Sequence, residues 1–214
     1  MKIRVYIADD HAIIRDGLRA LLEARDDIEV VGDAGDGRQA VAEIRSVRPD
    51  VVLMDISMPQ MNGIEAAALV RDAAPQARVI MLSMHATSEH LFRALQAGAR
   101  GYVLKNSAGG ELVDAVRAVH AGKRYFSAKI ADLLVDGYVR DERPTSPMQD
   151  LSARERQILQ LIAEGGTSAE VARTLSLSPK TVETYRSRLM QKLGVKNLPE
   201  LIKFAIQNRL IPLE

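Results

Sequence analysis

The sequence predicts an α/β domain on a doubly wound, five-stranded parallel sheet, followed by a small domain made only of helices. Two observations lead to this prediction. Over roughly the first 120 residues, short apolar runs alternate with amphipathic helical patterns, which is typical of βα repeats. After about residue 150 the strand-like runs stop, and one helix-capping pattern follows another.

The five predicted strands are short, continuously apolar and rich in β-branched residues, as expected of strands buried on both faces. They are Ile3–Ala8, Val30–Ala34, Val51–Met54, Val79–Ser83 and Tyr102–Leu104. Helical patterns lie between them; Ile14, Leu18 and Leu22, for example, fall on one helical face. The alternation of strands and helices predicts a sheet covered by helices on both faces, and right-handed crossovers leave few possible topologies.

We expect the first domain to occupy residues 1–122 and the second to occupy residues 151–214. Between them, residues 123–150 are predicted to form a linker. Its second part, Arg140–Asp150, is polar, contains two prolines and has no periodicity. Ile130–Val139 could form a short helix that extends the first domain, and the pattern leaves this open.

Helix starts in the second domain are marked by two capping boxes, Ser152 with Glu155 and Thr167 with Glu170. The helical patterns predict a four-helix domain. Within it, a helix over Ser168–Leu175 meets the short turn Ser176–Ser178, and a longer helix runs over Pro179–Leu193, with proline at its first position. This spacing is typical of a helix-turn-helix.

Composition and charge restrict the class of protein. The 214 residues are 47% hydrophobic and 27% charged, and they include no cysteine. The segment MKIRVYIADD reaches paired acids too early for a signal peptide, and no apolar run could span a bilayer. We therefore expect a cytoplasmic protein without a membrane partner. The 64 residues from Leu151 onward hold ten Lys and Arg against six Asp and Glu, whereas the preceding residues hold 19 against 22.

Three carboxylates follow two of the predicted strands. Asp9 and Asp10 come after the first strand, and Asp55 comes after the third. In a doubly wound sheet, functional groups collect beyond the carboxyl ends of the strands. Neighbouring carboxylates repel each other, so this arrangement calls for a cation, and oxygen ligands favour Mg²⁺. Ser83 and Lys105 end the fourth and fifth strands; they could contact a phosphoryl group carried by an aspartate as an acyl phosphate.

The segments IADDH, VVLMDISMPQMNG, VIMLSMH and GYVLKNS together resemble the four signature segments of response-regulator receiver domains, which have a flavodoxin-like fold. The resemblance implies that Asp55 is the phosphoacceptor. It also implies a Mg²⁺ site made by Asp10, Asp55 and the backbone carbonyl of Ser57, with Asp9 acting through water. Ser83 and Tyr102 would then be the switch residues, and Lys105 would contact the phosphate. His11, beside the acids, is expected to have a loop or capping role.

The longer helix of the second domain has two different faces. Val182, Tyr185, Leu189 and Leu193 are expected to face the core. The residues expected to contact DNA, through base edges or phosphates, are Lys180, Thr181, Glu183, Thr184, Arg186, Ser187, Arg188 and Lys192. Glu183 is ambiguous, because it could accept a bond from a base or pair with a neighbouring cation.

The segment LSARERQILQLIAEG, with the helix pair that follows it, resembles the LuxR-type helix-turn-helix domain, and the two resemblances together indicate a response regulator of the NarL/FixJ class. They imply a sensor histidine kinase as phosphoryl donor and double-stranded promoter DNA as target. They also imply a phosphorylation-dependent homodimer, in which relatives often use the last helix, here about Leu198–Asn208. Many relatives carry an asparagine-lysine pair where this chain has Ser168 and Ala169.

Three alternatives remain open at this point. An aspartyl-phosphate phosphatase or phosphotransferase would usually carry a second acid two residues after its nucleophile, and Ser57 stands there instead. A DNA-binding protein could use the receiver fold only as a dimerisation platform. An RNA-binding protein is disfavoured because the sequence offers no aromatic stacking platform. We therefore expect a transcription regulator that is not a turnover enzyme.

Overall fold

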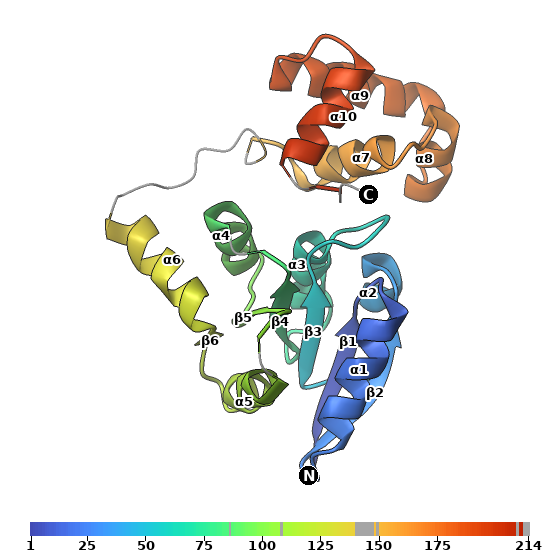
Figure 1. The fold of residues 1–214 in the computed structure, drawn as a ribbon. Helices are drawn as coiled ribbons and strands as arrows, with labels where there is room; N and C mark the ends of the chain where they lie inside the picture. The colour runs from blue at the N-terminus through green and yellow to red at the C-terminus, as the bar shows by residue number, and fades with distance from the viewer. Residues whose placement is uncertain (86, 108, 140–147, 149, 209, 212–214) are drawn as a thin grey trace. The chain divides into compact units, whose positions relative to one another are not determined.

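The computed structural model describes residues 1–85, 87–107, 109–139, 148, 150–208 and 210–211 (Figure 1). The chain divides into two compact units, Met1–Pro144 and Thr145–Glu214. No helix in the described ranges is long and apolar enough to cross a membrane.

The first unit is a parallel sheet with helices between its strands, as the sequence predicts. In the described residues, the strand order is β2-β1-β3-β4-β5-β6, and every neighbouring pair is parallel. The elements are β1 (Ile3–Ala8), α1 (Ala12–Glu23), β2 (Ile28–Ala34), α2 (Gly37–Val47), β3 (Val51–Asp55), α3 (Gly63–Ala73), β4 (Arg78–Ser83), α4 (Ser88–Gln96), β5 (Gly101–Leu104), α5 (Gly109–His120), β6 (Tyr125–Phe126) and α6 (Ala128–Val139).

The sheet has one strand more than the five that the sequence predicts. β6 contains two residues, too few to show a periodicity, and Phe126 pairs with Tyr102 of β5. The backbone N–H of Ser127 then donates to the Tyr102 carbonyl at 3.1 Å, and α6 follows with Ile130 fully buried in the core. Part of the predicted linker therefore packs on the first unit, whereas residues 140–147 lie outside the described residues.

Alternation along the strands divides the core of the first unit into two layers. Tyr6, Met54 and Met81 face the side covered by α2, α3 and α4 (Figure 1). Their neighbours Ile7 and Leu53 face the side covered by α1 and α5. Because both faces are buried, β3, β4 and β5 are apolar except at their ends. Their polar side chains are thereby left to the strand ends, whereas the less buried β2 also carries Glu29 and Asp33.

The second unit contains α7 (Ala153–Ala163), α8 (Ser168–Leu175), α9 (Pro179–Leu193) and α10 (Leu198–Gln207). Both predicted capping boxes are present, at the starts of α7 and α8. Ser178 caps α9, with proline in its first turn, and Gly194 ends it in the left-handed conformation. Val182 and Leu189 are fully buried, and Tyr185 and Leu193 pack against the same core. The inward face of α9 is therefore the one that the sequence predicts.

Gly63 illustrates how tightly the loop after β3 is held. A Cβ added there would lie 1.8 Å from the Asp55 carbonyl oxygen and 2.9 Å from Met54 Cγ. We therefore predict that Gly63→Ala lowers the free energy of unfolding by about 3 kcal/mol or more, because backbone must move. Urea unfolding of the full chain, followed by circular dichroism, measures this.

Gly110→Ala is the matched control, since an added Cβ in that α5 position meets nothing within 4 Å. It should leave stability unchanged or raise it by up to about 1 kcal/mol, the helix propensity difference between alanine and glycine. Equal effects of the two substitutions would contradict the assigned role of Gly63.

Candidate functional site

The carboxyl ends of four strands bring the predicted pocket residues to one edge of the sheet (Figure 1). The register pairs Ala8 with Met54 and Ser83 with Leu104. The residues that follow these pairs therefore lie beside one another: Asp9 next to Asp55, and Lys105 next to the end of β4. Parallel pairing places the side chains together although they are far apart in the sequence.

Lys105 joins the two buried carboxylates. Its Nζ lies 2.7 Å from Asp9 Oδ2 and 3.0 Å from Asp55 Oδ2. All three side chains are largely withdrawn from solvent, with exposed fractions of 7% for Lys105, 0% for Asp9 and 4% for Asp55. A buried ion pair of this kind is held by direct contact and is little screened by salt.

Asp10 and His11 form the outer part of the same cluster. The His11 Nδ1 lies 2.7 Å from Asp10 Oδ1, and the His11 backbone N–H donates to Asp9 Oδ1 at 3.0 Å. His11 occupies the N-cap position of α1, but its side chain makes no capping bond. The expected loop position is thus found, and the imidazole additionally contacts an acid of the pocket.

Burial controls the electrostatics of the pocket. It raises the pKa of Asp55 to about 6; Lys105 acts in the opposite direction, and Asp9 and Asp10 add to the rise. Burial by itself would lower the pKa of Lys105, but Asp55 and Asp9 outweigh it, so that pKa is raised. The lysine stays charged, and the pocket retains an excess of negative charge.

The donor set suits a hard cation. Asp9, Asp10, His11 and Asp55 each offer one ligand atom, and these atoms all lie within 4.8 Å of one another. Three of the four are carboxylate oxygens, the ligands that Mg²⁺ prefers. The excess negative charge and the oxygen ligands together fit a divalent metal. Ser57 lies two residues after Asp55, half-buried, and the role of its carbonyl stays a prediction.

Ser83 and Tyr102 meet at one backbone carbonyl. The Ser83 hydroxyl donates to the His85 carbonyl at 2.8 Å and accepts from the His85 N–H at 3.2 Å. The Tyr102 hydroxyl donates to the same carbonyl at 3.3 Å, and its ring is 1% exposed. The sequence could not single out His85 for this role, because a backbone carbonyl is independent of residue type.

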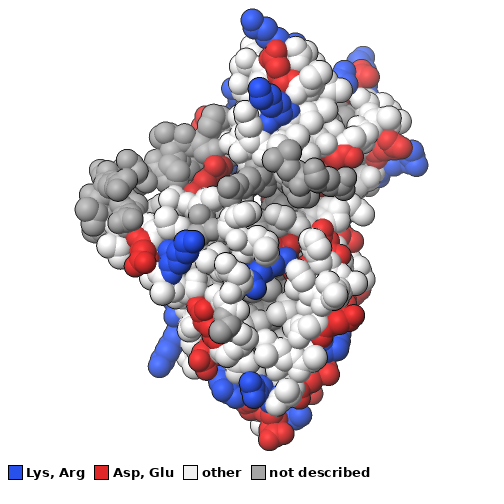
Figure 2. All heavy atoms as spheres, in the orientation of Figure 1, with Lys and Arg blue, Asp and Glu red and all other residues white. Residues whose placement is uncertain are grey.

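The outward face of α9 is accessible as predicted. Among the residues predicted to contact DNA, Thr181 and Arg186 are half-buried; Lys180, Glu183, Thr184, Ser187, Arg188 and Lys192 are exposed. The Thr184 hydroxyl donates to the Lys180 carbonyl one turn earlier, at 2.9 Å. Basic and acidic side chains are interspersed over the surface seen in Figure 2.

Lys192 is engaged within the second unit. Its Nζ lies 3.1 Å from Glu155 Oε2, the same oxygen that accepts the Ser152 N–H at 2.7 Å in the capping box of α7. These bonds hold the pKa of Glu155 below its ordinary value, the Ser152 backbone bond being the largest cause. Glu155 was not among the predicted site residues, since 37 positions separate it from Lys192.

The raised pKa of Asp55 predicts that its replacement by a neutral residue stabilises the folded protein in a pH-dependent way. The pKa is about 6 in the folded chain against an ordinary 3.8, so the charged form costs up to about 3 kcal/mol above pH 6 and nothing below pH 4. Asp55→Asn should therefore stabilise the metal-free protein at pH 7 but not at pH 4, in urea unfolding with a chelator present.

Asp26→Asn provides the control, because Asp26 is exposed. It should change stability little at either pH. A gain for Asp55→Asn that is equal at pH 4 and pH 7 would show that ionisation of Asp55 is not its cause.

Comparison with known proteins identifies both units. The response regulator receiver domain matches residues 5–117, and the luxR family of bacterial regulatory proteins matches residues 149–205. The chain is 39% identical to the oxygen regulatory protein NreC of Staphylococcus aureus (strain JH9), covering 98% of this chain and 99% of that protein.

Two solved structures extend this comparison. A LuxR family two-component response regulator from Aurantimonas sp. SI85-9A1 is 39% identical, with a TM-score of 0.63 over 65% of this chain and 99% of that one. RcsB from Salmonella enterica serovar Typhimurium, bound to a promoter in the presence of the phosphomimetic BeF3−, is 28% identical, with a TM-score of 0.67 over 97% of this chain and 100% of that one. The chain thus belongs to the response regulators of the NarL/FixJ type, DNA-binding regulators rather than metabolic enzymes, with a receiver domain followed by a LuxR-type DNA-binding domain.

Proposed function

We propose that Asp55 accepts a phosphoryl group from a phosphohistidine of a partner sensor kinase, and that this controls DNA binding by the second unit. An Asp55 carboxylate oxygen forms the new P–O bond while the P–N bond to the histidine breaks, and the leaving imidazole takes up a proton. The observation that carries this proposal is the Lys105 bridge between Asp55 and Asp9, at 3.0 and 2.7 Å. It places a cation where phosphoryl oxygens would gather negative charge.

Asp9, Asp10, Asp55 and the Ser57 carbonyl would hold Mg²⁺ in this scheme, with Asp9 acting through water. The bound ion would supply positive charge to the phosphoryl oxygens. His11 orients Asp10 through the 2.7 Å contact between them. The part of these protein residues is to fix the acceptor carboxylate and to balance the charge of the transferred group.

Ser83, His85 and Tyr102 connect the phosphorylation site to the rest of the first unit. When a phosphoryl group is attached to Asp55, the Ser83 hydroxyl donates to one of its oxygens instead of to the His85 carbonyl. The His85 carbonyl then keeps only the Tyr102 hydroxyl of its two side-chain donors. The balance between two arrangements of the loop after β4 shifts as a result.

The outward face of α9 would enter the major groove of promoter DNA. Lys180, Arg186, Arg188 and Lys192 contact phosphates, and Thr181, Glu183, Thr184 and Ser187 lie on the base-reading side. Phosphorylation promotes a homodimer, with α10 as contact surface. A two-fold dimer of this kind selects paired half-sites about one helical turn apart.

The test of this function compares DNA binding with and without a small acyl-phosphate donor and Mg²⁺. The full chain should select paired half-sites from a random-sequence pool and should bind them more tightly, by about tenfold, after phosphorylation. Asp55→Asn should abolish phosphorylation and the increase but keep the basal DNA affinity. Asp26→Asn, which removes an exposed acid, should behave as the wild type.

Two results would contradict the proposal. Mg²⁺-dependent phosphorylation retained in Asp55→Asn would remove Asp55 as acceptor. DNA affinity indifferent to the donor would leave the receiver domain as a dimerisation platform only. In the same assay, Tyr102→Phe should still accept the phosphoryl group but show a smaller gain in DNA affinity, because it lacks the donor to His85.

The Glu155–Lys192 contact predicts a variant with tighter DNA binding. Glu155→Gln keeps an oxygen that accepts the Ser152 N–H, but it removes the charge that holds Lys192. The affinity for DNA should rise by about threefold to tenfold in low salt. The slope of log affinity against log salt concentration should become steeper by about one, because one more lysine is available to a phosphate. Fluorescence anisotropy at several salt concentrations measures both.

Glu170→Gln is the matched control, because Glu170 fills the equivalent position in the capping box of α8 and makes no ion pair with a lysine among the described residues. An equal gain in both variants would assign the effect to overall charge and would reject a specific role of Glu155.

A further inference from the structure

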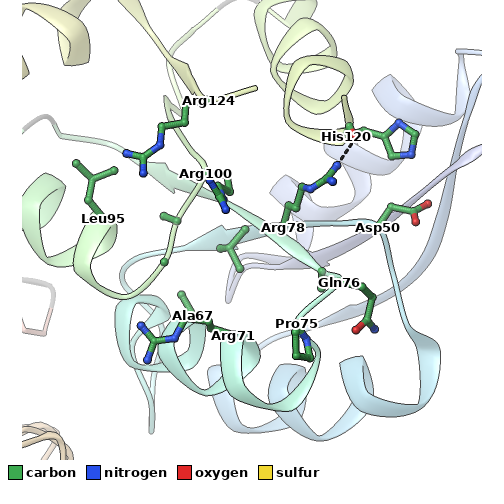
Figure 3. Close-up of a pocket in the computed structure, with 14 residues that line it drawn as sticks. Asp50, Ala67, Arg71, Pro75, Gln76, Arg78, Leu95, Arg100, His120 and Arg124 are labelled. Carbon is green, nitrogen blue, oxygen red and sulfur yellow. Dashed lines mark hydrogen bonds between the residues drawn. The ribbon is translucent and has the colours of Figure 1, made fainter. Parts of the chain in front are cut away.

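A cavity of about 670 Å³ lies at the amino-terminal edge of β3, β4 and β5, away from the acidic pocket. Its walls come from the residue before β3, from α3 and the segment that follows it, and from the start of β4 (Figure 3). The end of α4, the segment before β5, the end of α5 and the residue before β6 complete them. All of them belong to the first unit, and none of them is an acidic-pocket residue. We propose that this cavity binds a small anion that carries phosphate groups.

The charge of the lining supports an anionic ligand. Four arginines line the cavity: Arg71, Arg78, Arg100 and Arg124. The lining includes a single carboxylate, Asp50, whose Oδ2 accepts the backbone N–H of Arg4 at 2.9 Å. Figure 3 shows Arg71, Arg100 and Arg124 on the side of Leu95, with Asp50 on the other side. Cations that gather with so little compensation raise the local potential, which an anion would lower.

Two of the four arginines have structural partners. The Arg78 guanidinium donates to the carbonyls of Val119 and His120 and so satisfies the end of α5. Figure 3 shows the bond to His120. Arg71 lies 3.2 Å from the Asp72 carboxylate and donates to the Gln96 carbonyl. Arg78 thus holds the end of α5 in place as part of the cavity wall. Arg71 contributes positive charge to the cavity, because a surface ion pair such as the one with Asp72 is weak.

Arg100 and Arg124 are the ligand-binding groups of the proposal. Both side chains are exposed, and within the described part of the chain neither guanidinium has a hydrogen bond or an ion pair. Arg100 is nevertheless anchored by its backbone, whose N–H donates to the Val79 carbonyl and whose carbonyl accepts the Tyr125 N–H. Arg100 therefore presents its five-donor fork from a fixed backbone position, and Arg124 is the neighbour of Tyr125, which one of these bonds joins to Arg100.

The chemistry of the lining identifies the class of ligand. The planar guanidinium fork matches two oxygens of a phosphate group. Ala67, Val79 and Leu95 add apolar surface beside the arginines. The volume lies in the range of small-molecule sites rather than of a protein interface. A phosphate ester with an apolar part fits this lining, and inorganic phosphate shares its charged chemistry.

Isothermal titration of the full chain with inorganic phosphate, pyrophosphate and ADP tests the proposal. A chelator is present, so that no metal can recruit phosphate to the acidic pocket. The variant Arg100→Gln/Arg124→Gln should bind pyrophosphate and ADP more weakly by about tenfold or more. The control Arg25→Gln/Arg45→Gln removes the same charge from two exposed arginines outside the cavity and should bind as the wild type.

A second readout locates the ligand. On addition of ADP, the backbone amide resonances of Gly98, Ala99 and Arg100 should shift in the wild type and not in the cavity variant. ADP binding tighter than pyrophosphate would identify an organic phosphate; equal affinities would identify phosphate groups alone. Absence of binding to all three probes, or equal loss in the control, would overturn the proposal. The proposal would also be overturned if Arg100→Gln/Arg124→Gln bound the three probes as the wild type does and were impaired only in binding duplex DNA.

Discussion

The ammonium group of Lys105 between two buried carboxylates is the interaction on which the acidic pocket depends. Asp9 and Asp55 lie at the ends of adjacent strands, where burial raises the pKa of Asp55 and the charge of Asp9 adds to that rise. The Lys105 ammonium group, 2.7 Å from Asp9 and 3.0 Å from Asp55, offsets the repulsion between the two carboxylates. It still leaves the cluster negative, because Asp10 adds a third carboxylate. The same imbalance suits the cluster to a divalent ion and to a reactive carboxylate.

The parallel sheet supplies the geometry for this balance. β1 and β5 end on apolar residues that Asp9 and Lys105 follow, and Asp55 and Ser83 are themselves the last residues of β3 and β4. These four side chains therefore emerge at the common edge. The loop after β3 is fixed by Gly63, whose N–H donates to the Ile56 carbonyl at 2.9 Å where no side chain would fit. The Asp55 carboxylate is thus placed by backbone packing on one side and by Lys105 on the other.

The strand and helix pattern allowed much of this arrangement to be predicted from the sequence. Apolar runs place Asp9, Asp55 and Lys105 after strands, and parallel topology then brings them together without knowledge of side-chain positions. The helix starts of the second unit were equally predictable, because capping depends on residues three positions apart. β6 was missed, since a strand of two residues leaves no periodicity to detect.

Contacts between distant segments carried no comparable signal. Glu155 and Lys192 meet only because α7 packs against α9. The arginines of the cavity come from four separate segments, and each alone has the composition of an ordinary solvated surface. The acceptor that Ser83 and Tyr102 share is the backbone carbonyl of His85, and a backbone carbonyl is present whatever the residue type. Such features follow from the tertiary fold rather than from local pattern.

The pairing of β5 with β6 has a mechanical consequence for Tyr102, one of the two proposed switch residues. Tyr102 donates its hydroxyl to the loop after β4, while its backbone carbonyl accepts the Ser127 N–H that precedes α6. One residue therefore contacts both the loop after β4, which we propose to respond to phosphorylation, and the start of α6. With Ile130 fully buried, α6 is anchored to the sheet from its first turn. A displacement of the Tyr102 side chain would therefore be transmitted to the start of α6 through the interior of the first unit, not through its solvent-exposed surface.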